Sequence, residues 1–227
     1  MSDADRLTEW ATAHERMQAD WTAVITDPAQ DGEVRIADWT QRIQAMQEEV
    51  DALRSAGQWR SGPRSLLAAL GLQYDELKLT SALAWLLQPD GHHGLSDRLL
   101  RRFCDHAGAA PTAFSPVTVQ TEETRVDTRA DLVVRMPGAT VLVEAKVRAG
   151  EQHRQCARLA ELWQHEDPAL VFLTPDRRRP SEAEDSLDRW TPMSWREVAD
   201  MAAAAAHESE NPASGVSELI DTLRGEP

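Results

Sequence analysis

Three side chains in one short segment have the types and the spacing of a metal-assisted phosphate site. Asp131 begins an apolar, strand-like run, and Glu144 with Lys146 ends the next run, after a turn at Pro137-Gly138. Residues two apart in a strand point to the same face, so Glu144 and Lys146 project together. A hairpin through the turn would bring Asp131 alongside them. Two carboxylates and an ammonium on one face can bind a hard divalent cation and a phosphate.

The same spacing also has an ordinary explanation. An acid and a lysine two residues apart at a strand end often form only a solvated salt bridge. The apolar run Val141-Leu142-Val143, however, is typical of a buried central strand. We therefore expect Glu144 and Lys146 at the rim of a core, where ligands tend to bind, and we favour the metal site.

The composition is that of a globular protein with a sizeable core. The chain has 227 residues, of which 41% are hydrophobic and 27% charged. No apolar run approaches the roughly 20 residues that span a bilayer, and the acidic start Met1-Ser-Asp-Ala-Asp5 is unlike a signal peptide. Cys104 and Cys156 lie far apart and neither belongs to a Cys-x-x-Cys pair. This argues against structural zinc and favours a reduced, cytoplasmic setting.

The net charge of -14 argues against a protein that coats nucleic acid through bulk electrostatics. Any contact with nucleic acid must be local, through bridging metal ions or a basic patch. Two candidate patches are the cluster Arg98, Arg101 and Arg102 and the run Arg177-Arg178-Arg179. Each is equally well explained as a solvated helix face or a loop.

The first 60 residues are expected to form a helical hairpin. Apolar residues recur at three-to-four spacing over 3–27 and again over 33–56, which is the pattern of amphipathic helices. The hairpin either packs on the rest of the chain or forms a dimer interface. We take 1–60 as one domain and 61–227 as the other.

The second domain is expected to be α/β with a mixed sheet. In chain order the predicted segments are helices at 64–70, 73–87 and 96–106, strands at 117–126, 129–136 and 140–147, a helix at 151–165, a strand at 169–173, and helices at 194–207 and 213–224. The helix between the last two strands is a crossover, so those strands should be parallel. The polar stretch 174–190 is predicted to be a loop. Ser96 should cap the third helix, and Ser194 with Glu197 should form a capping box.

This order of elements, with Asp131 and then Glu144-x-Lys146, is similar to the PD-(D/E)XK nuclease superfamily. The likeness covers about residues 70–200 and extends to one bacterial branch of the superfamily. Besides Glu76, it is carried by Ser81-x-Leu-x-Trp-Leu-Leu-x-Pro89, His93-Gly-Leu95, Arg129-x-Asp-Leu132, Ala149-Gly-Glu-Gln-x-x-Gln155, Phe172-Leu-Thr-Pro-Asp-Arg177 and Met193-Ser-Trp-Arg-Glu-Val198.

The resemblance implies a restriction-endonuclease-like αβββαβ core and metal-dependent hydrolysis of phosphodiester bonds. It implies that Asp131 and Glu144 hold Mg²⁺ or Mn²⁺, with the backbone carbonyl of Ala145 as a third ligand. Lys146 would orient the attacking water, deprotonate it, or stabilise the developing charge. We favour orientation and charge stabilisation over a general base, because the nearby carboxylates keep an ammonium protonated.

Glu76 and Gln155 enter only through the resemblance. It implies that Glu76 is an outer ligand or serves a second metal, and that Gln155 bonds the attacking water or a phosphate oxygen. Without it, Glu76 is a helix first-turn acid favoured by the macrodipole, and Gln155 is an exposed residue with Gln152 as its rival. The loop pair His92 and His93 is a weaker metal candidate, because adjacent histidines rarely face one ion.

The sequence departs from the branch in three places. Leu159 replaces a tyrosine, Cys156 replaces a leucine, and Ala130 stands where the superfamily name has proline. The proline position varies across the superfamily. Leu159 puts a substrate or packing contact in doubt rather than the metal site.

The favoured function is therefore a metal-dependent nuclease that acts on DNA. The resemblance associates this branch with bacterial defence or mobile elements. The alternative is a catalytically inactive relative that binds nucleic acid or protein, and the complete set of Asp131, Glu144 and Lys146 argues against it. A third reading is a structural subunit whose hairpin recruits a second copy or a partner protein. Strand preference and cutting mode are not predicted.

Overall fold

The structure is a computed structural model that describes residues 12–21, 32–58, 62–63 and 65–225. It separates into two compact units, residues 1–61 and 62–227, and each is described by itself. None of the described helices has the length and apolarity needed to cross a membrane.

The first unit is helical in its described parts. Residues 12–21 form one helix and α2 (Gly32–Ser55) a second. The Trp21 and Trp39 rings meet edge to face with centroids 6.3 Å apart. The rest of the helix expected at 3–27 lies outside the described residues. Several apolar side chains of α2 remain exposed, namely Ile36, Ile43 and Met46.

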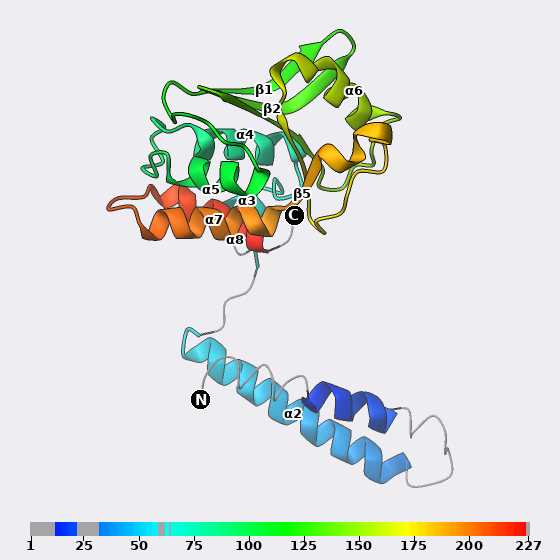
Figure 1. Ribbon diagram of the computed structural model, residues 1–227. Coiled ribbons are helices and arrows are strands. Elements are labelled where there is room, and N and C mark those ends of the chain that lie inside the picture. The colour runs from blue at the N-terminus through cyan, green and yellow to red at the C-terminus, as the bar shows by residue number, and fades with distance from the viewer. Residues whose placement is uncertain (1–11, 22–31, 59–61, 64, 226–227) are drawn as a thin grey trace. The chain divides into compact units, whose positions relative to one another are not determined.

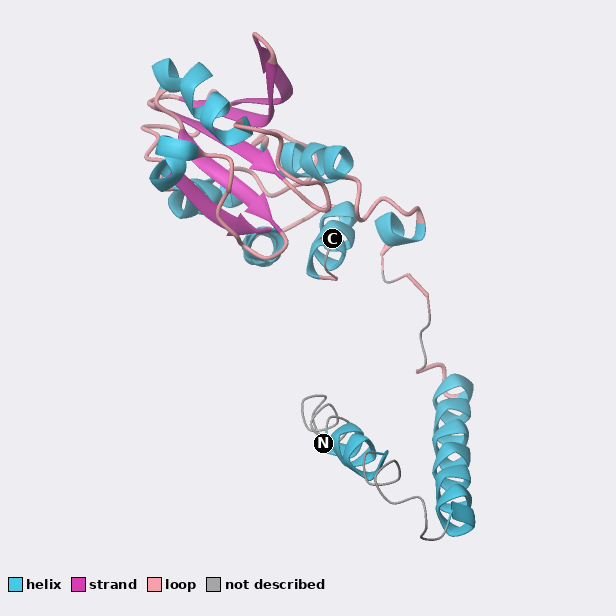
Figure 2. Ribbon diagram, turned by 90° about the vertical axis from the view of Figure 1, so that its right-hand side faces the viewer, coloured by secondary structure: helices cyan, strands magenta, loops and turns pink. Residues whose placement is uncertain are grey.

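The second unit is built on a five-stranded mixed sheet in the order β1-β2-β3-β4-β5 (Figures 1 and 2). The strands are β1 (Thr118–Arg125), β2 (Thr128–Met136), β3 (Ala139–Ala145), β4 (Ala169–Thr174) and β5 (Trp190–Ser194). The first three form an antiparallel meander, and β4 and β5 run parallel to β3. The predicted α/β fold, its meander and its parallel fourth strand are confirmed.

Helices cover both faces of this sheet (Figure 1). They are α3 (Leu66–Ala69), α4 (Glu76–Leu87), α5 (Arg98–Ala107), α6 (Gln155–Leu162), α7 (Trp195–His207) and α8 (Ser214–Arg224), with short 3-10 turns η1 (Gln164–Glu166) and η2 (Glu184–Arg189). The larger core lies between the sheet and α4, α5, α7 and α8. A smaller core joins the opposite face to α6.

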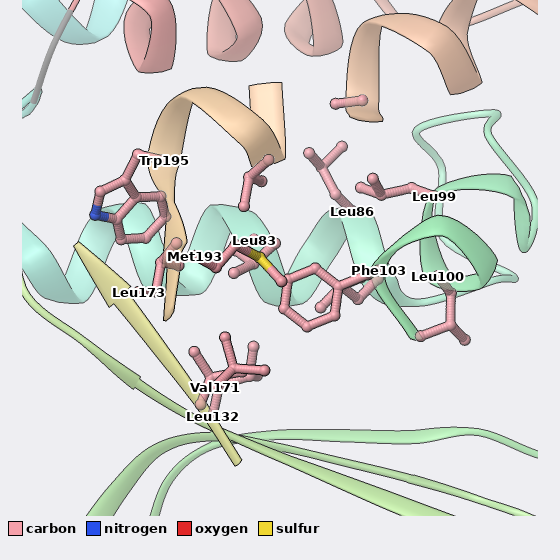
Figure 3. Close-up of a cluster of buried hydrophobic side chains, with 14 of the residues drawn as sticks. Leu83, Leu86, Leu99, Leu100, Phe103, Leu132, Val171, Leu173, Met193 and Trp195 are labelled. Carbon is pink, nitrogen blue, oxygen red and sulfur yellow. The ribbon is translucent and has the colours of Figure 1, made fainter. Parts of the chain in front are cut away.

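Strand alternation divides the side chains between the two cores. In β3, Val141 and Val143 face the larger core, whereas Leu142 faces the smaller one with α6. Figure 3 shows Phe103 of α5 and Met193 of β5 packed among leucines of α4 and the sheet. Full burial of one such side chain contributes about 1.5–3 kcal/mol, so this packing fixes the sheet under α4.

One strand was missed by the sequence prediction. The stretch 174–190 is not only a loop, because it contains η2 and leads into β5, which pairs with β4. Pro192 lies within β5, and proline is tolerated in an edge strand. Its first residue, Trp190, is anchored by an edge contact with Phe172 at 6.4 Å between ring centroids. This long-range packing compensates for a weak local strand signal.

Two helix starts also differ from the prediction, and one is confirmed. Ser96 has φ +51°, which is not the extended conformation of an N-cap, and α5 begins after Asp97. The helix expected from 151 begins at Gln155, because Arg154 is left-handed with φ +54°. The capping box of Ser194 is present at the start of α7.

Candidate metal and phosphate site

The acidic pair lies where β2 and β3 stop pairing. Their ladder ends with Leu132 opposite Val143, one step before Asp131 and Glu144. Beyond that point the Asp131 carboxylate accepts a hydrogen bond of 2.8 Å from the backbone N–H of Ala145. Asp131 is 7% exposed and Glu144 0%. Both carboxylates are therefore buried at the point where the backbone pairing of β2 and β3 ends.

Lys146 is fixed at both its backbone and its side chain. Its N–H donates to the carbonyl of Leu173 on β4 at 2.8 Å, and its carbonyl accepts from Trp195 Nε1 at 3.1 Å. Its Nζ lies 2.5 Å from Glu144 Oε1 and 3.6 Å from Glu76 Oε1. The ammonium thus joins the strand acid to an acid on a helix.

Glu76 reaches this site from the first turn of α4. Asp75 caps the helix by accepting from the N–H of Lys78. Glu76 Oε2 accepts from the backbone N–H of Val147 at 3.1 Å. The acid therefore holds the chain immediately after Lys146, in addition to any effect of the helix dipole. The structure brings together Asp131, Glu144, Lys146 and Glu76.

Burial dominates the electrostatics of the three acids. It raises the pKa of Glu144 well above its usual range, and the neighbouring Asp131 raises it further, although Lys146 opposes both. Burial also raises the pKa values of Asp131 and Glu76. For Lys146, burial favours the neutral amine, but the attraction of the three carboxylates prevails and raises the pKa of its ammonium. The three acids thus favour the protonated form of Lys146, which contacts two of them, Glu144 and Glu76.

Comparison with known proteins agrees with this arrangement. Residues 65–219 match the family model of the PD-(D/E)XK nuclease superfamily. The chain belongs to the PD-(D/E)XK nuclease superfamily. The matched PD-(D/E)XK region includes the sheet and the four site residues, and membership of this superfamily indicates a nuclease. Searches of curated proteins and of solved structures returned no significant match.

The donor set of this PD-(D/E)XK chain fits a hard divalent cation. Glu144 Oε2 is buried and has no hydrogen-bond partner, which leaves an oxygen for a cation. In the part of the chain that the structure describes, no three acidic, histidine or cysteine side chains are close enough to enclose a metal. Two carboxylates suffice for Mg²⁺, which keeps several waters. Asp131 and Glu144 would be the side-chain ligands of such a cation, and Glu76 would be an outer group.

The two remaining predicted site residues, Ala145 as a metal ligand and Gln155 as a contact to water or phosphate, have simpler surroundings. Ala145 is the last residue of β3, and its N–H is already used by Asp131. Gln155 is buried at the start of α6, where its Oε1 accepts from the N–H of Gln152 at 3.3 Å. The rival Gln152 is exposed. Gln155 is thus fixed by its own loop rather than by the acids.

The other metal candidate has a structural place. His93 is buried, its Nδ1 accepts from the N–H of Leu95 at 3.0 Å, and its Nε2 contacts the carbonyl of Gln88 at 2.7 Å. Both ring nitrogens are therefore used to hold the loop after α4, and His92 is exposed. The pair is not arranged to share an ion.

The two candidate basic patches are largely neutralised. Five of their arginines have carboxylate partners: Arg101 with Asp97, Arg102 with Glu208, Arg177 with Glu197, Arg178 with Glu151, and Arg179 with Asp188. Neither patch offers a uniformly basic surface. Sequence reasoning missed a different group beside the site, the stacked pair Arg148 and Tyr74, as well as the hydrogen bond from Trp195. No local sequence pattern predicts either contact.

Proposed function

We propose that the chain is a divalent-metal-dependent nuclease that hydrolyses phosphodiester bonds in DNA. The observation that carries this proposal is the buried Glu144 carboxylate, which has one unpartnered oxygen beside Asp131 and one oxygen on Lys146. A buried carboxylate is costly unless it is fully partnered. A cation at this oxygen would remove that cost, so the site is better suited to a metal than to a structural role alone.

Asp131 and Glu144, with the Ala145 carbonyl, would hold Mg²⁺ or Mn²⁺. When bound, the metal supplies positive charge that polarises a phosphate and activates water. Lys146 stays protonated because of its three acidic neighbours, so it donates hydrogen bonds and stabilises charge rather than accepting a proton. Glu76 orients Lys146, and the Gln155 amide would donate to a phosphate oxygen.

The hairpin has a separate proposed role. Residues 1–60 are proposed to contact a second copy of the chain or a partner protein, because α2 exposes a row of apolar side chains. An acidic nuclease gains DNA affinity from such a partner. Light scattering of the whole chain and of a variant with Ile36, Ile43 and Met46 changed to Ser tests self-association. If both proteins have the mass of a monomer, self-association is ruled out and contact with a partner protein remains the proposed role.

The decisive experiment for the nuclease is Asp131→Asn. This variant keeps an oxygen that can accept from the Ala145 N–H, so the backbone geometry at the end of the β2–β3 ladder should be retained. Loss of a ligand should reduce cleavage by about a thousandfold, which corresponds to several kcal/mol of transition-state stabilisation. The matched control is Asp188→Asn, which makes the same charge change at a side chain that is 97% exposed.

Both variants and the parent are assayed on plasmid, linear duplex, single-stranded DNA and RNA, with Mg²⁺, Mn²⁺ or EDTA. Cleavage that requires metal and is lost only in Asp131→Asn supports the proposal. Equal cleavage by both variants would overturn it. Nucleic-acid binding by the parent without cleavage under any metal would establish the inactive binding module instead.

A further inference from the structure

One arginine beside the site is stacked flat on an aromatic ring. The guanidinium carbon of Arg148 lies 3.2 Å from the centre of the Tyr74 ring. Both residues are exposed, and Tyr74 retains 38% of its accessible surface. The ring covers one face of the guanidinium, and the N–H groups around its edge remain available. Stacking fixes the plane of a group that would otherwise be mobile.

This pair is attached directly to the proposed catalytic residues. Arg148 follows Lys146 by two positions, and Tyr74 precedes Glu76 by two. Between the two pairs, Glu76 Oε2 binds the N–H of Val147. The same connection between the start of α4 and the end of β3 therefore carries both the catalytic ammonium and the stacked guanidinium. A ligand at Lys146 would lie next to Arg148.

Arg148 also differs from the arginines nearest to it in the sequence, because it has no acidic partner among the described residues. Every other arginine between positions 125 and 179 forms a salt bridge with a carboxylate, namely Arg125, Arg129, Arg135, Arg154, Arg158, Arg177, Arg178 and Arg179. Within the described residues, no carboxylate lies within 4.0 Å of the Arg148 guanidinium, so its charge is left for an external anion. In a chain with net charge -14, such an exception concentrates the local attraction for an anion at this point.

We propose that Arg148, held in plane by Tyr74, binds a backbone phosphate of the nucleic acid adjacent to the one that is cleaved. The inference rests on the proposed nuclease function and deepens it. A planar guanidinium presents paired N–H donors that match two phosphate oxygens. The acidic protein then binds its substrate through one arginine next to the proposed metal ligands, rather than through a broad basic surface.

A purely structural role makes a different prediction. If the stack only ties the end of β3 to α4, its loss loosens the loop and lowers thermal stability, but leaves the number of phosphate contacts unchanged. The number of contacts is measured by the salt dependence of binding, because each neutralised phosphate adds about 0.9 to the slope of log affinity against log salt on duplex DNA, and about 0.7 on a single strand.

The experiment measures binding of a fluorescein-labelled DNA duplex and of its single strand. All proteins carry Asp131→Asn, so that cleavage is suppressed. Arg148→Ala is compared with Arg148→Lys, Tyr74→Phe and Tyr74→Leu. The matched control is Arg189→Ala, which removes an exposed arginine at the end of η2 that forms no salt bridge with any described residue. Affinity is measured over a series of salt concentrations, and melting temperatures are measured in parallel.

We expect Arg148→Ala to weaken binding about tenfold, the ratio for one charge-assisted hydrogen bond, and to reduce the salt slope by about 1. Arg148→Lys should keep the slope but bind more weakly than arginine, because it loses the paired donors. Tyr74→Phe should bind as the parent does, and Tyr74→Leu should bind more weakly. Arg189→Ala should change neither quantity.

Two failures are distinguishable. Suppose that the Asp131→Asn parent binds DNA and that Arg148→Ala has the same affinity and salt slope as Arg189→Ala. The proposed phosphate contact is then wrong, while the nuclease proposal stands. A lower melting temperature with an unchanged slope assigns the stack to structure alone and also overturns it. If the chain with an intact site neither binds nor cuts DNA, the proposed DNA nuclease itself fails.

Discussion

The indole N–H of Trp195 donates a hydrogen bond of 3.1 Å to the backbone carbonyl of Lys146. Trp195 is the first residue of α7 and is fully buried at the edge of the larger core (Figure 3). The backbone of Lys146, whose ammonium is proposed to be catalytic, is therefore anchored by the same core packing that stabilises the sheet. Core packing and side-chain position at the site are coupled through this contact.

Trp195→Phe should weaken both the fold and the reaction. Phenylalanine keeps an aromatic ring but leaves the Lys146 carbonyl without its donor, which costs about 1–3 kcal/mol in free energy of unfolding. The displaced ammonium should lower kcat more than it changes KM. Denaturant unfolding and steady-state cleavage measure the two effects.

Trp190→Phe is the matched control for that experiment. Trp190 Nε1 donates to Ser186 Oγ at 3.3 Å, on the smaller core. Trp190→Phe should lower the free energy of unfolding by a similar amount and leave kcat near the parent value. An equal fall of kcat in the two variants would show that Trp195 has no particular influence on Lys146.

Lys146 and Glu144 should be strongly coupled in stability. Lys146→Met leaves the buried Glu144 carboxylate without its cation, at a cost of about 3–5 kcal/mol. The double variant with Glu144→Gln removes the unpaired charge and should recover much of this loss, although both variants are expected to be inactive. Denaturant unfolding of the two single variants and the double variant measures the coupling. Simple additivity would contradict the ion pair seen here.

Metal binding should weaken as the pH falls. Burial raises the pKa values of Asp131 and Glu144, and the charge of Asp131 raises that of Glu144 further, so protons compete with the cation. Without metal, the folded state binds more protons than the unfolded chain over the interval above the usual carboxyl pKa. Stability of the metal-free protein should accordingly decline as the pH rises through that interval.

Calorimetric Mn²⁺ titration at several pH values, in two buffers of different ionisation heat, measures affinity and proton release together. Proton release that grows toward low pH is expected. Asp131→Asn, with one carboxylate fewer, should release fewer protons and melt at a higher temperature than the parent in EDTA. An affinity that is independent of pH would argue that both acids are already ionised.

A second group of charges should control acid stability. Hydrogen bonds from Arg135, and then from Arg125, lower the pKa of Glu166 to about 2 from its usual 4.5. Because the folded-state value is depressed, this contribution is complete above about pH 4.5 and is lost as the pH falls toward 2. Melting temperatures over this interval should fall less steeply for Glu166→Gln than for the parent. If the melting temperatures of the two proteins fall in parallel, the interactions of Glu166 with the arginines contribute nothing to acid stability.

Much of the fold and part of the site arrangement can be predicted from local sequence. Period-two spacing places Glu144 and Lys146 on one face, and the Pro137-Gly138 turn brings Asp131 to the strand beside them. Both follow from backbone geometry that any hairpin shares. The capping box of Ser194 is equally local, because its partner is three residues away.

The features that were missed depend on distant partners. The Glu151 carboxylate accepts from the backbone of Ser181 and Glu182 and pairs with Arg178. These contacts hold it outside α6, although its local sequence favours helix. Likewise, Trp195 finds the Lys146 carbonyl only after β4 and α7 have packed. Contacts between residues that are tens of positions apart produce no periodic pattern in the sequence.

The segment from Glu144 to Arg148 is thus held by parts of the chain made at very different times. Glu76 and Asp131 precede it, whereas the Leu173 carbonyl and the Trp195 indole follow. During translation, a growing polypeptide has all four acidic and basic groups well before it has Trp195. If the chain is the nuclease proposed above, its cleavage activity should therefore appear only after Trp195 has been synthesised.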